Sequence, residues 1–190
     1  MRDRIGLAFF SFAAIVSALS AWEHPGLLAS LLAWLAAGHN LILAALYAFR
    51  RTPAKTDRVG LGLGLLAAVL PLTTSYTEVM PVLFIVVGIL GYALIFWSLL
   101  SLGDRFGIAP ADRGLVMRGP YRLVRHPMYL GELMLRAALA AASTQILLSA
   151  GMLIILVVIQ VLRTVREERI ILGYSAYAGQ VPYRLIPGIW

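Results

Sequence analysis

RGPYRLVRHPMYLGE, residues 118–132, brings three arginines, a histidine, two prolines and two tyrosines together between two long apolar segments. The rest of the chain is very different, because 61% of its 190 residues are hydrophobic and only 13% are charged. A soluble domain of this length could not bury so much apolar surface. The polar stretch is therefore expected to lie at the edge of an all-α integral membrane fold.

Six apolar segments are predicted to form helices: residues 5–22, 27–49, 59–76, 79–102, 128–142 and 144–162. Most of them reach the roughly 20 residues that cross a bilayer core. The fifth is short, about 22 Å at the helical rise per residue, so it is either a half-span or part of a tilted hairpin with the sixth. We therefore predict five or six transmembrane helices that end in a C-terminal helical hairpin.

The 16 Lys and Arg residues are not spread evenly over the connections. They precede the first segment and follow the second, fourth and sixth, whereas the three intervening turns have none, and only Arg136 lies within a span. This is the positive-inside pattern of a multi-pass membrane protein. It predicts that both termini and the loop 103–127 face the cytoplasm. The net positive charge of the chain is thus attributed to its membrane topology and not to nucleic-acid binding.

The chain contains no cysteine, which excludes disulfides, thiolate metal sites and a cysteine nucleophile. We interpret His24 and His39 as interfacial and core polar residues, so no metal centre is expected. The sequence also lacks a Ser-His-Asp pattern, a P-loop and a dinucleotide fingerprint. It is interpreted as a single membrane domain, 1–190, with N-terminal helices in 1–102 and a loop, hairpin and tail in 103–190.

Two polar regions flank the last hairpin, and a hairpin brings its two ends to the same membrane face. In the second region, RTVREERI prolongs the sixth helix, so that Arg163 and Glu167 share one face while Arg166 and Glu168 point elsewhere. One interpretation is a helix end with a salt bridge at the membrane surface. The other is a carboxylate that meets a cationic ligand and a guanidinium that meets an anionic one.

In the first region, Pro127 suits the first turn of the fifth helix. Arg125 and His126 then stand just before a helix N-terminus, where backbone N–H groups and the helix dipole can receive an anion such as a carboxylate. Binding of lipid headgroups is the alternative for such a basic loop. Within the fifth segment, Glu132 and Arg136 are compatible with a structural ion pair and with a functional role, and neither is assigned.

Several motifs together resemble a known family of enzymes. They are Leu115-Val116, GPY at 119–121, RHPMY at 125–129 with Gly131, the pair EE at 167–168, Tyr174, Tyr177 and the tail RLIPGIW. In this order and spacing they resemble the isoprenylcysteine carboxyl methyltransferase family and the related phospholipid N-methyltransferases. The resemblance covers the C-terminal half of the chain; the N-terminal half matches only as apolar spans, which leaves the choice of substrate open.

The resemblance implies a cytoplasm-facing pocket for S-adenosylmethionine, formed by the loop, the hairpin and the tail. The residues implied to contact this cofactor are Arg113, Gly114, Leu115, Val116, Tyr121, Arg125, His126, Pro127, Met128, Tyr129 and Glu167. Arg163 is implied to bind the substrate carboxylate and so to be the catalytic residue. One upstream contact, usually polar in the family, falls at Phe106 here.

The chemistry of these residues agrees with that ligand. Its ammonium suits Glu167, its carboxylate suits Arg125 and His126, and its adenine suits apolar Leu115, with Val116 and Tyr121 beside it; charge-assisted contacts of this kind are strong. A carboxylate acceptor is already nucleophilic at neutral pH, so methyl transfer to it needs alignment and desolvation. An amine or a thiol would need a general base.

The sequence thus predicts an S-adenosylmethionine-dependent membrane methyltransferase, similar to protein-S-isoprenylcysteine O-methyltransferase, that methylates a carboxylate of a lipidic or prenylated substrate. The alternatives are N-methylation of a phospholipid amine and S-methylation of a small thiol. Different classes also remain open: a non-catalytic lipid-binding membrane protein, or a membrane reductase with a nicotinamide cofactor.

Overall fold

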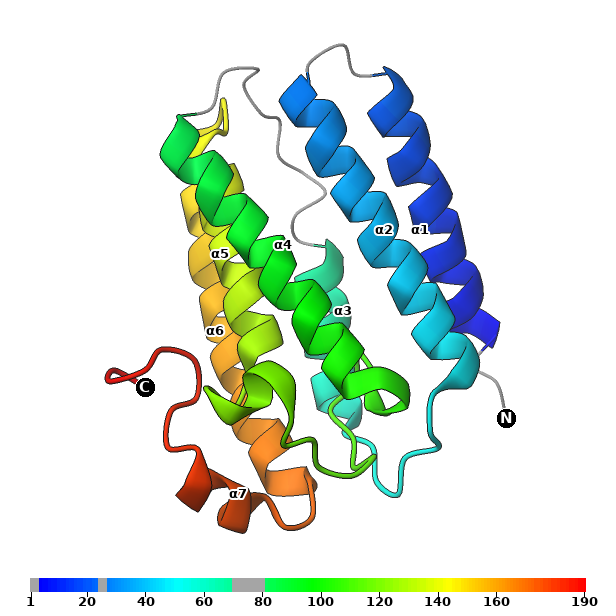
Figure 1. Ribbon diagram of the computed structural model, residues 1–190, viewed down its shortest axis with the longest axis vertical. Helices are drawn as coiled ribbons and strands as arrows, with labels where there is room; N and C mark the ends of the chain where they lie inside the picture. The colour runs from blue at the N-terminus through cyan, green and yellow to red at the C-terminus, as the bar shows by residue number, and fades with distance from the viewer. Residues whose placement is uncertain (1–3, 24–26, 70–80) are drawn as a thin grey trace. The chain divides into compact units, whose positions relative to one another are not determined.

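The computed structural model describes residues 4–23, 27–69 and 81–190. All elements of secondary structure within these residues are helical. The only extended pairing among them is one isolated bridge between Thr56 and Ala111. The helices are α1 (Arg4–Glu23), α2 (Leu27–Phe49), α3 (Arg58–Val69), α4 (Val82–Leu102), α5 (Pro127–Ala141), α6 (Ile146–Ile170) and α7 (Tyr174–Gln180), with 3-10 turns η2 (Gly103–Arg105) and η3 (Gly119–Arg122) (Figure 1). The predicted all-α class is confirmed.

Four stretches of the described helices are long and apolar enough to cross a membrane. They are Arg4–Trp22, Ser30–Phe49, Val82–Arg105 and Ile146–Ile170. The other two predicted segments give shorter helices, since α3 has 12 described residues and α5 has 15. The rest of the predicted segment 59–76 lies outside the described residues. Four apolar helices fit the predicted integral membrane protein, and the choice between five and six crossings stays a prediction.

The chain divides into two compact units, and the first contains α1, α2 and residues Gly103–Phe106. Helices α1 and α2 run antiparallel, as hydrogen bonds from Ser30 to Ala21 and from Asn40 to Ser17 show (Figure 1). The Tyr47 ring packs edge-on against Phe106, with 5.9 Å between the centroids. Phe106 is thus a buried core residue of this unit, 4% exposed, which explains why an apolar side chain stands at that position.

The second unit contains Pro53–Leu102 and Gly107–Trp190, and within it α4 and α5 approach each other at two glycines. A Cβ atom added to Gly91 would lie 2.9 Å from the carbonyl oxygen of Gly131, and one added to Gly131 would lie 2.8 Å from that of Gly91. Small residues allow helix backbones to touch, which is how helices associate closely in a membrane. Gly131 of the RHPMYLGE stretch is therefore needed for packing.

Replacing Gly131 with alanine should destabilise the helix pair, since the new methyl group would overlap the Gly91 carbonyl and the Ile95 side chain. Overpacking of this kind costs about 1–3 kcal/mol. Thermal unfolding of the purified protein in detergent measures the effect. The matched control is Gly151→Ala in α6, where an added Cβ would face open space and alanine favours the helix. Equal melting temperatures of the two variants would contradict the packing role.

Helices α5 and α6 form the predicted C-terminal hairpin, closed at its turn by a 2.7 Å hydrogen bond between Ser149 and Ser143. Helix α6 continues to Ile170, as predicted from RTVREERI. Helix α3 packs on α6 through a cluster of Ala67, Leu156 and Ile159. The hairpin is thereby held on one side by α4 and on another by α3.

Segment 54–57 pairs with residues 110–112 and ties the start of α3 to α6. The backbone N–H of Ala54 donates to Asp112 O and that of Asp112 donates to Lys55 O, at 2.9 and 3.0 Å. Asp57 caps α3 by accepting from the Val59 N–H and makes a two-pronged ion pair with Arg166. The Arg166 hydrogen bonds hold the pKa of the Asp57 carboxyl at about 2. Arg166 therefore points away from Glu167, as predicted.

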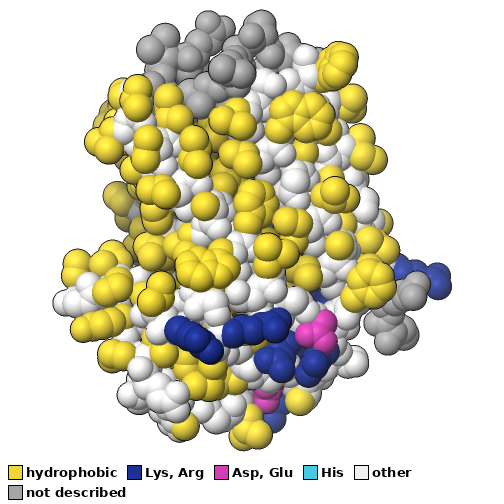
Figure 2. Space-filling model, viewed as in Figure 1, with side chains coloured by type: hydrophobic (Ala, Val, Ile, Leu, Met, Phe, Trp, Pro, Cys, Tyr) yellow, Lys and Arg dark blue, Asp and Glu magenta, His cyan; other side chains and the backbone are white. Residues whose placement is uncertain are grey.

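The helices expose mainly apolar side chains. Figure 2 shows such side chains spread over the face that it draws, and a group of neighbouring Lys and Arg side chains. Along α4 the exposed residues include Leu83, Leu90, Trp97 and Leu100. An apolar surface of this extent suits contact with lipid.

Candidate active site

The site begins at His126, which stands just before the N-terminus of α5, with Pro127 in the first helical position, as predicted. The imidazole is 5% exposed. Its Nδ1 lies 3.2 Å from Glu167 Oε2, its Nε2 lies 2.9 Å from the Tyr174 hydroxyl, and its ring stacks on Tyr129. These contacts join the start of α5 to the end of α6 and to α7.

Tyr129 brings together the two residues that were predicted to share a face of α6. Its hydroxyl donates to Glu167 Oε2 at 3.1 Å, and the Arg163 guanidinium lies 4.6 Å above its ring. Arg163 is buried and also donates to Gln160 Oε1 and to Ile108 O, each at 3.1 Å. The guanidinium and the carboxylate, one helical turn apart, thus meet at one aromatic ring.

Glu168, which was predicted to point away from the face that Arg163 and Glu167 share, also belongs to this cluster and approaches the other nitrogen of the His126 ring. Its carboxylate accepts from Arg125 Nη1 at 2.9 Å, from Arg184 Nε and Nη2 at 2.9 Å each, and lies 3.6 Å from His126 Nε2. The C-terminal tail contributes to this, since it folds back and brings Arg184 to the end of α6. Ionised partners of this kind make the stronger hydrogen bonds of a protein.

The tail is fixed to the start of α5 by backbone pairing. The N–H groups of Arg125 and His126 donate to the carbonyl oxygens of Tyr183 and Arg184, both at 2.9 Å. Arg125 Nη2 donates to Pro182 O. The tail therefore forms part of the wall around His126.

An aromatic cluster on α7 forms the apolar part of the site. Tyr174, Tyr177 and Val181 pack together, and Leu115 of the connecting loop packs against them. The Tyr177 hydroxyl donates to the carbonyl oxygen of Tyr121 at 2.6 Å. The connecting loop and α7 are thus joined through Leu115 and Tyr121, two residues that the resemblance singles out.

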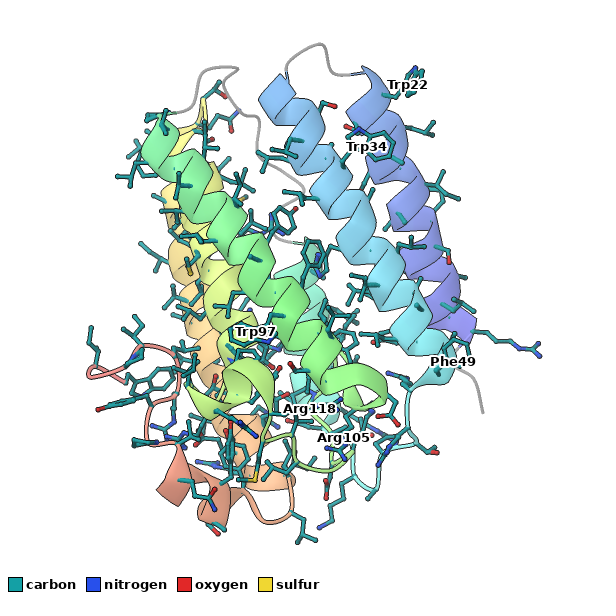
Figure 3. The ribbon with its side chains drawn as sticks, in the orientation of Figure 1. Trp22, Trp34, Phe49, Trp97, Arg105 and Arg118 are labelled. Atoms are coloured by element: carbon teal, nitrogen blue, oxygen red, sulfur yellow. The ribbon has the colours of Figure 1, made fainter. Side chains whose placement is uncertain are left out.

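The turn η3 positions the RGPYRLVRHPMYLGE stretch against α4. Gly119 has φ 59°, and a Cβ there would lie 3.1 Å from Trp97 Nε1, so both backbone shape and space require glycine. Arg118 Nε donates to Ser101 O at 2.9 Å, and Figure 3 shows Arg118 and Trp97 near the same end of α4. Arg122 Nε donates to Met117 O. Arg118 thus has a structural contact besides its place at the predicted membrane surface.

The remaining predicted cofactor residues occupy the same loop and helix start. Arg113 is buried and donates to Ala109 O, while Gly114 adopts φ 89° and its N–H donates to Asp112 Oδ1. Val116 is buried and Met128 is half-buried. The partners in these two hydrogen bonds belong to the same loop. That Arg113 and Gly114 line a cofactor pocket remains a prediction.

His126 is held among carboxylates despite its burial. Burial lowers the pKa of an imidazole, but the hydrogen bonds and charges of Glu167 and Glu168 outweigh it and raise the pKa of His126 above its ordinary value. The imidazolium then links the two carboxylates. The cluster combines carboxylates, cationic groups and phenols at one end of an apolar hairpin.

The fold and the cluster define an integral membrane protein with a candidate catalytic site at the end of a helical hairpin. Residues 76–174, more than half of the chain, match the family model described as phospholipid methyltransferase, and the chain belongs to this family. The predicted resemblance is confirmed, and membership implies a membrane methyltransferase. The matched range includes His126, Arg163 and Glu167. No curated protein matches the chain.

The residues of the cluster fit the S-adenosylmethionine that such enzymes use. Arg125 Nε is buried and has no hydrogen-bond partner among the described residues, so it can donate to an anionic group. The Glu167 side chain keeps 23% of its surface exposed, which leaves its carboxylate accessible to a cation. The Leu115, Tyr174 and Tyr177 cluster offers an apolar surface. Among the described residues no group of three or more metal-ligating side chains is found.

The charge of His126 should make the stability of the protein depend on pH. Because its folded pKa is raised, its contribution to stability is complete below the ordinary value of 6.5 and is lost as the pH rises through the folded pKa. The melting temperature in detergent should therefore fall above pH 6.5. His126→Gln should remove this part of the pH dependence. An unchanged pH profile in the variant would contradict the assignment.

Proposed function

We propose that the protein transfers a methyl group from S-adenosylmethionine to a lipidic acceptor, with carboxyl O-methylation the favoured reaction. The observation that carries the proposal is the meeting of His126, Tyr129, Arg163 and Glu167 at the end of the hairpin, within the range that matches the family. The positive-inside distribution supports a site that faces the cytoplasm, with both termini on that side.

Each polar group of the cofactor has a proposed partner. Glu167 receives the ammonium, and Arg125, with the start of α5, receives the carboxylate. Leu115, Val116 and Tyr121 border the adenine. The other residues proposed to line the pocket are Arg113, Gly114, His126, Pro127, Met128 and Tyr129. His126 acts by holding Glu167 and Glu168 in place, as its contacts with both suggest.

The bound cofactor supplies an electrophilic methyl group: a lone pair of the acceptor oxygen forms the new C–O bond while the methyl–sulfur bond breaks and its electrons remain on sulfur. No proton is released when the acceptor is a carboxylate, so the protein needs no general base. Arg163 holds the carboxylate in line with the methyl group, and its burial keeps the charge pair away from water.

N-methylation of a phospholipid amine is the second candidate, because the matching family model is described as phospholipid methyltransferase. An amine must lose a proton before it attacks. Two carboxylates, Glu132 and Glu167, interact electrostatically with Arg163 and would suit a cationic acceptor. Small-thiol S-methylation requires a base in the same way.

Calorimetry with S-adenosylhomocysteine in several detergents tests the proposed cofactor. Binding is the expected result, and the absence of binding in all of them would contradict the enzyme proposal. Incubation with methyl-labelled cofactor and membrane lipid extract then identifies the acceptor. A methyl ester releases labelled methanol in alkali, whereas an N-methyl product does not, so one treatment separates the two candidates. A protein that only binds lipid would give no labelled product.

A further inference from the structure

Three side chains form a polar chain inside the hairpin, with Glu132 on α5 and with Gln160 and Arg163 on α6. Gln160 is completely buried. Its Nε2 donates to Glu132 Oε2, and its Oε1 accepts from Arg163 Nη1 at 3.1 Å. We call these three residues the polar chain. It runs from a carboxylate within the apolar hairpin to the guanidinium at the candidate active site.

With Glu132 ionised, the donors and acceptors of the polar chain have one consistent arrangement. A carboxylate only accepts hydrogen bonds, a guanidinium only donates them, and an amide has one end of each kind. Glu132 therefore selects the donor end of Gln160 and turns the acceptor end towards Arg163. With the amide reversed, two acceptors would face each other at one end and two donors at the other. Such a mismatch is expensive for a group that water does not reach.

The Arg163 guanidinium is held by several contacts at once, one of which is the polar chain. Nη1 is bound by Gln160, Nη2 is bound by Ile108 O, and the guanidinium lies over the Tyr129 ring. These contacts fix the orientation in which the guanidinium meets an acceptor.

We infer that Glu132 is a positioning residue for methyl transfer: acting through Gln160, it sets the orientation of the Arg163 guanidinium towards the methyl acceptor. The inference rests on the proposed function, in which Arg163 binds that acceptor. It also gives a reason for an ionisable side chain within an apolar hairpin, where charge is costly. Glu132 accepts a hydrogen bond from Gln160, while Arg136, the neighbour that helical spacing suggests, acts on it through its charge.

Glu132→Gln tests this role with little change in shape. The new amide can donate as well as accept, so Gln160 is no longer forced into one orientation. We expect unchanged S-adenosylhomocysteine affinity and a loss in kcat/KM for the acceptor of roughly 10- to 100-fold, the range that small misplacements of a binding group produce. The probes are farnesylated N-acetylcysteine, as a carboxylate, and vesicles that contain phosphatidylethanolamine.

The exchange variant Glu132→Gln with Gln160→Glu gives the sharper result. The carboxylate now at position 160 would accept from both the new amide at position 132 and Arg163, so it restores the hydrogen bonds and the net charge of the polar chain. Recovery of kcat/KM to near the native value is expected. A well-folded exchange variant that is as slow as Glu132→Gln, or a Glu132→Gln variant with native kcat/KM, would overturn the inference.

A control separates positioning from general support of the hairpin. Ser149→Ala removes another buried hydrogen bond, to Ser143, at the opposite end of the same helix pair. It should lower the melting temperature without changing the acceptor KM. If both variants changed kcat/KM equally, Glu132 would be merely structural.

A second measurement needs no turnover. The guanidinium NMR signal of Arg163, assigned by its loss in Arg163→Lys, should exchange faster with solvent in Glu132→Gln and return to the native rate in the exchange variant. An unchanged signal would contradict the positioning role even if the acceptor were unknown. If the native protein failed to bind S-adenosylhomocysteine, the proposed function would fall, while this signal would still report on the polar chain.

Discussion

Glu167→Ala is expected to weaken S-adenosylhomocysteine binding by roughly 100-fold or more, the loss typical when one partner of a partly desolvated charge pair is removed. The reason is the position of Glu167, whose carboxylate is held by Tyr129 and His126 and retains an accessible face. Calorimetry of the detergent-solubilised protein measures the affinity. A thermal unfolding curve recorded beside it establishes that the variant is folded.

Two companion variants sharpen this prediction. Glu167→Gln keeps the size of the side chain and an acceptor for the Tyr129 hydroxyl but removes the charge, so it should weaken binding nearly as much as alanine does. Arg163→Ala should leave cofactor affinity almost native and reduce methyl transfer, because Arg163 is assigned to the acceptor. Equal loss of cofactor binding in the Glu167 and Arg163 variants would refute the division of roles.

The parts of this site that sequence could predict are the parts governed by local spacing. Residues 163 and 167 share a helical face because they are four apart, and the structure brings both side chains to Tyr129. Pro127 predicted the start of α5, and the long apolar runs predicted α1, α2, α4 and α6. Periodicity and helix-start chemistry are short-range signals, so a single sequence contains them.

The parts that sequence reasoning missed depend on segments far apart in the chain. Arg184 contacts Glu168 only because the tail folds back along α6, and Glu132 contacts Gln160 only because the register of the hairpin sets them opposite each other. No spacing rule relates such positions. Helical spacing related Glu132 to Arg136, whose charge does act on the Glu132 carboxyl, but it did not reveal the hydrogen bond of Glu132 across the hairpin.

Glu168→Gln should be the most destabilising polar substitution among the site residues. Glu168 is 14% exposed and holds Arg125, which is 8% exposed, together with Arg184. Removing one member of a buried ion pair leaves the other charge uncompensated and costs about 3–5 kcal/mol. We therefore expect a clear fall in the melting temperature in detergent, and faster proteolysis within the tail, which loses its attachment to α6.

The control for this prediction is the ion pair between Arg51 and Asp104, whose side chains are 54% and 42% exposed. Exposed pairs contribute about 1 kcal/mol or less, so Asp104→Asn should hardly change the melting temperature. Each variant removes one carboxylate charge, so the difference between their melting temperatures measures the combined effect of burial and of the second Arg partner of Glu168. If Glu168→Gln had the same melting temperature as Asp104→Asn and its tail stayed resistant to protease, the tail would not be held by Glu168. The wall that the tail contributes to the site would then depend on its backbone pairing with Arg125 and His126.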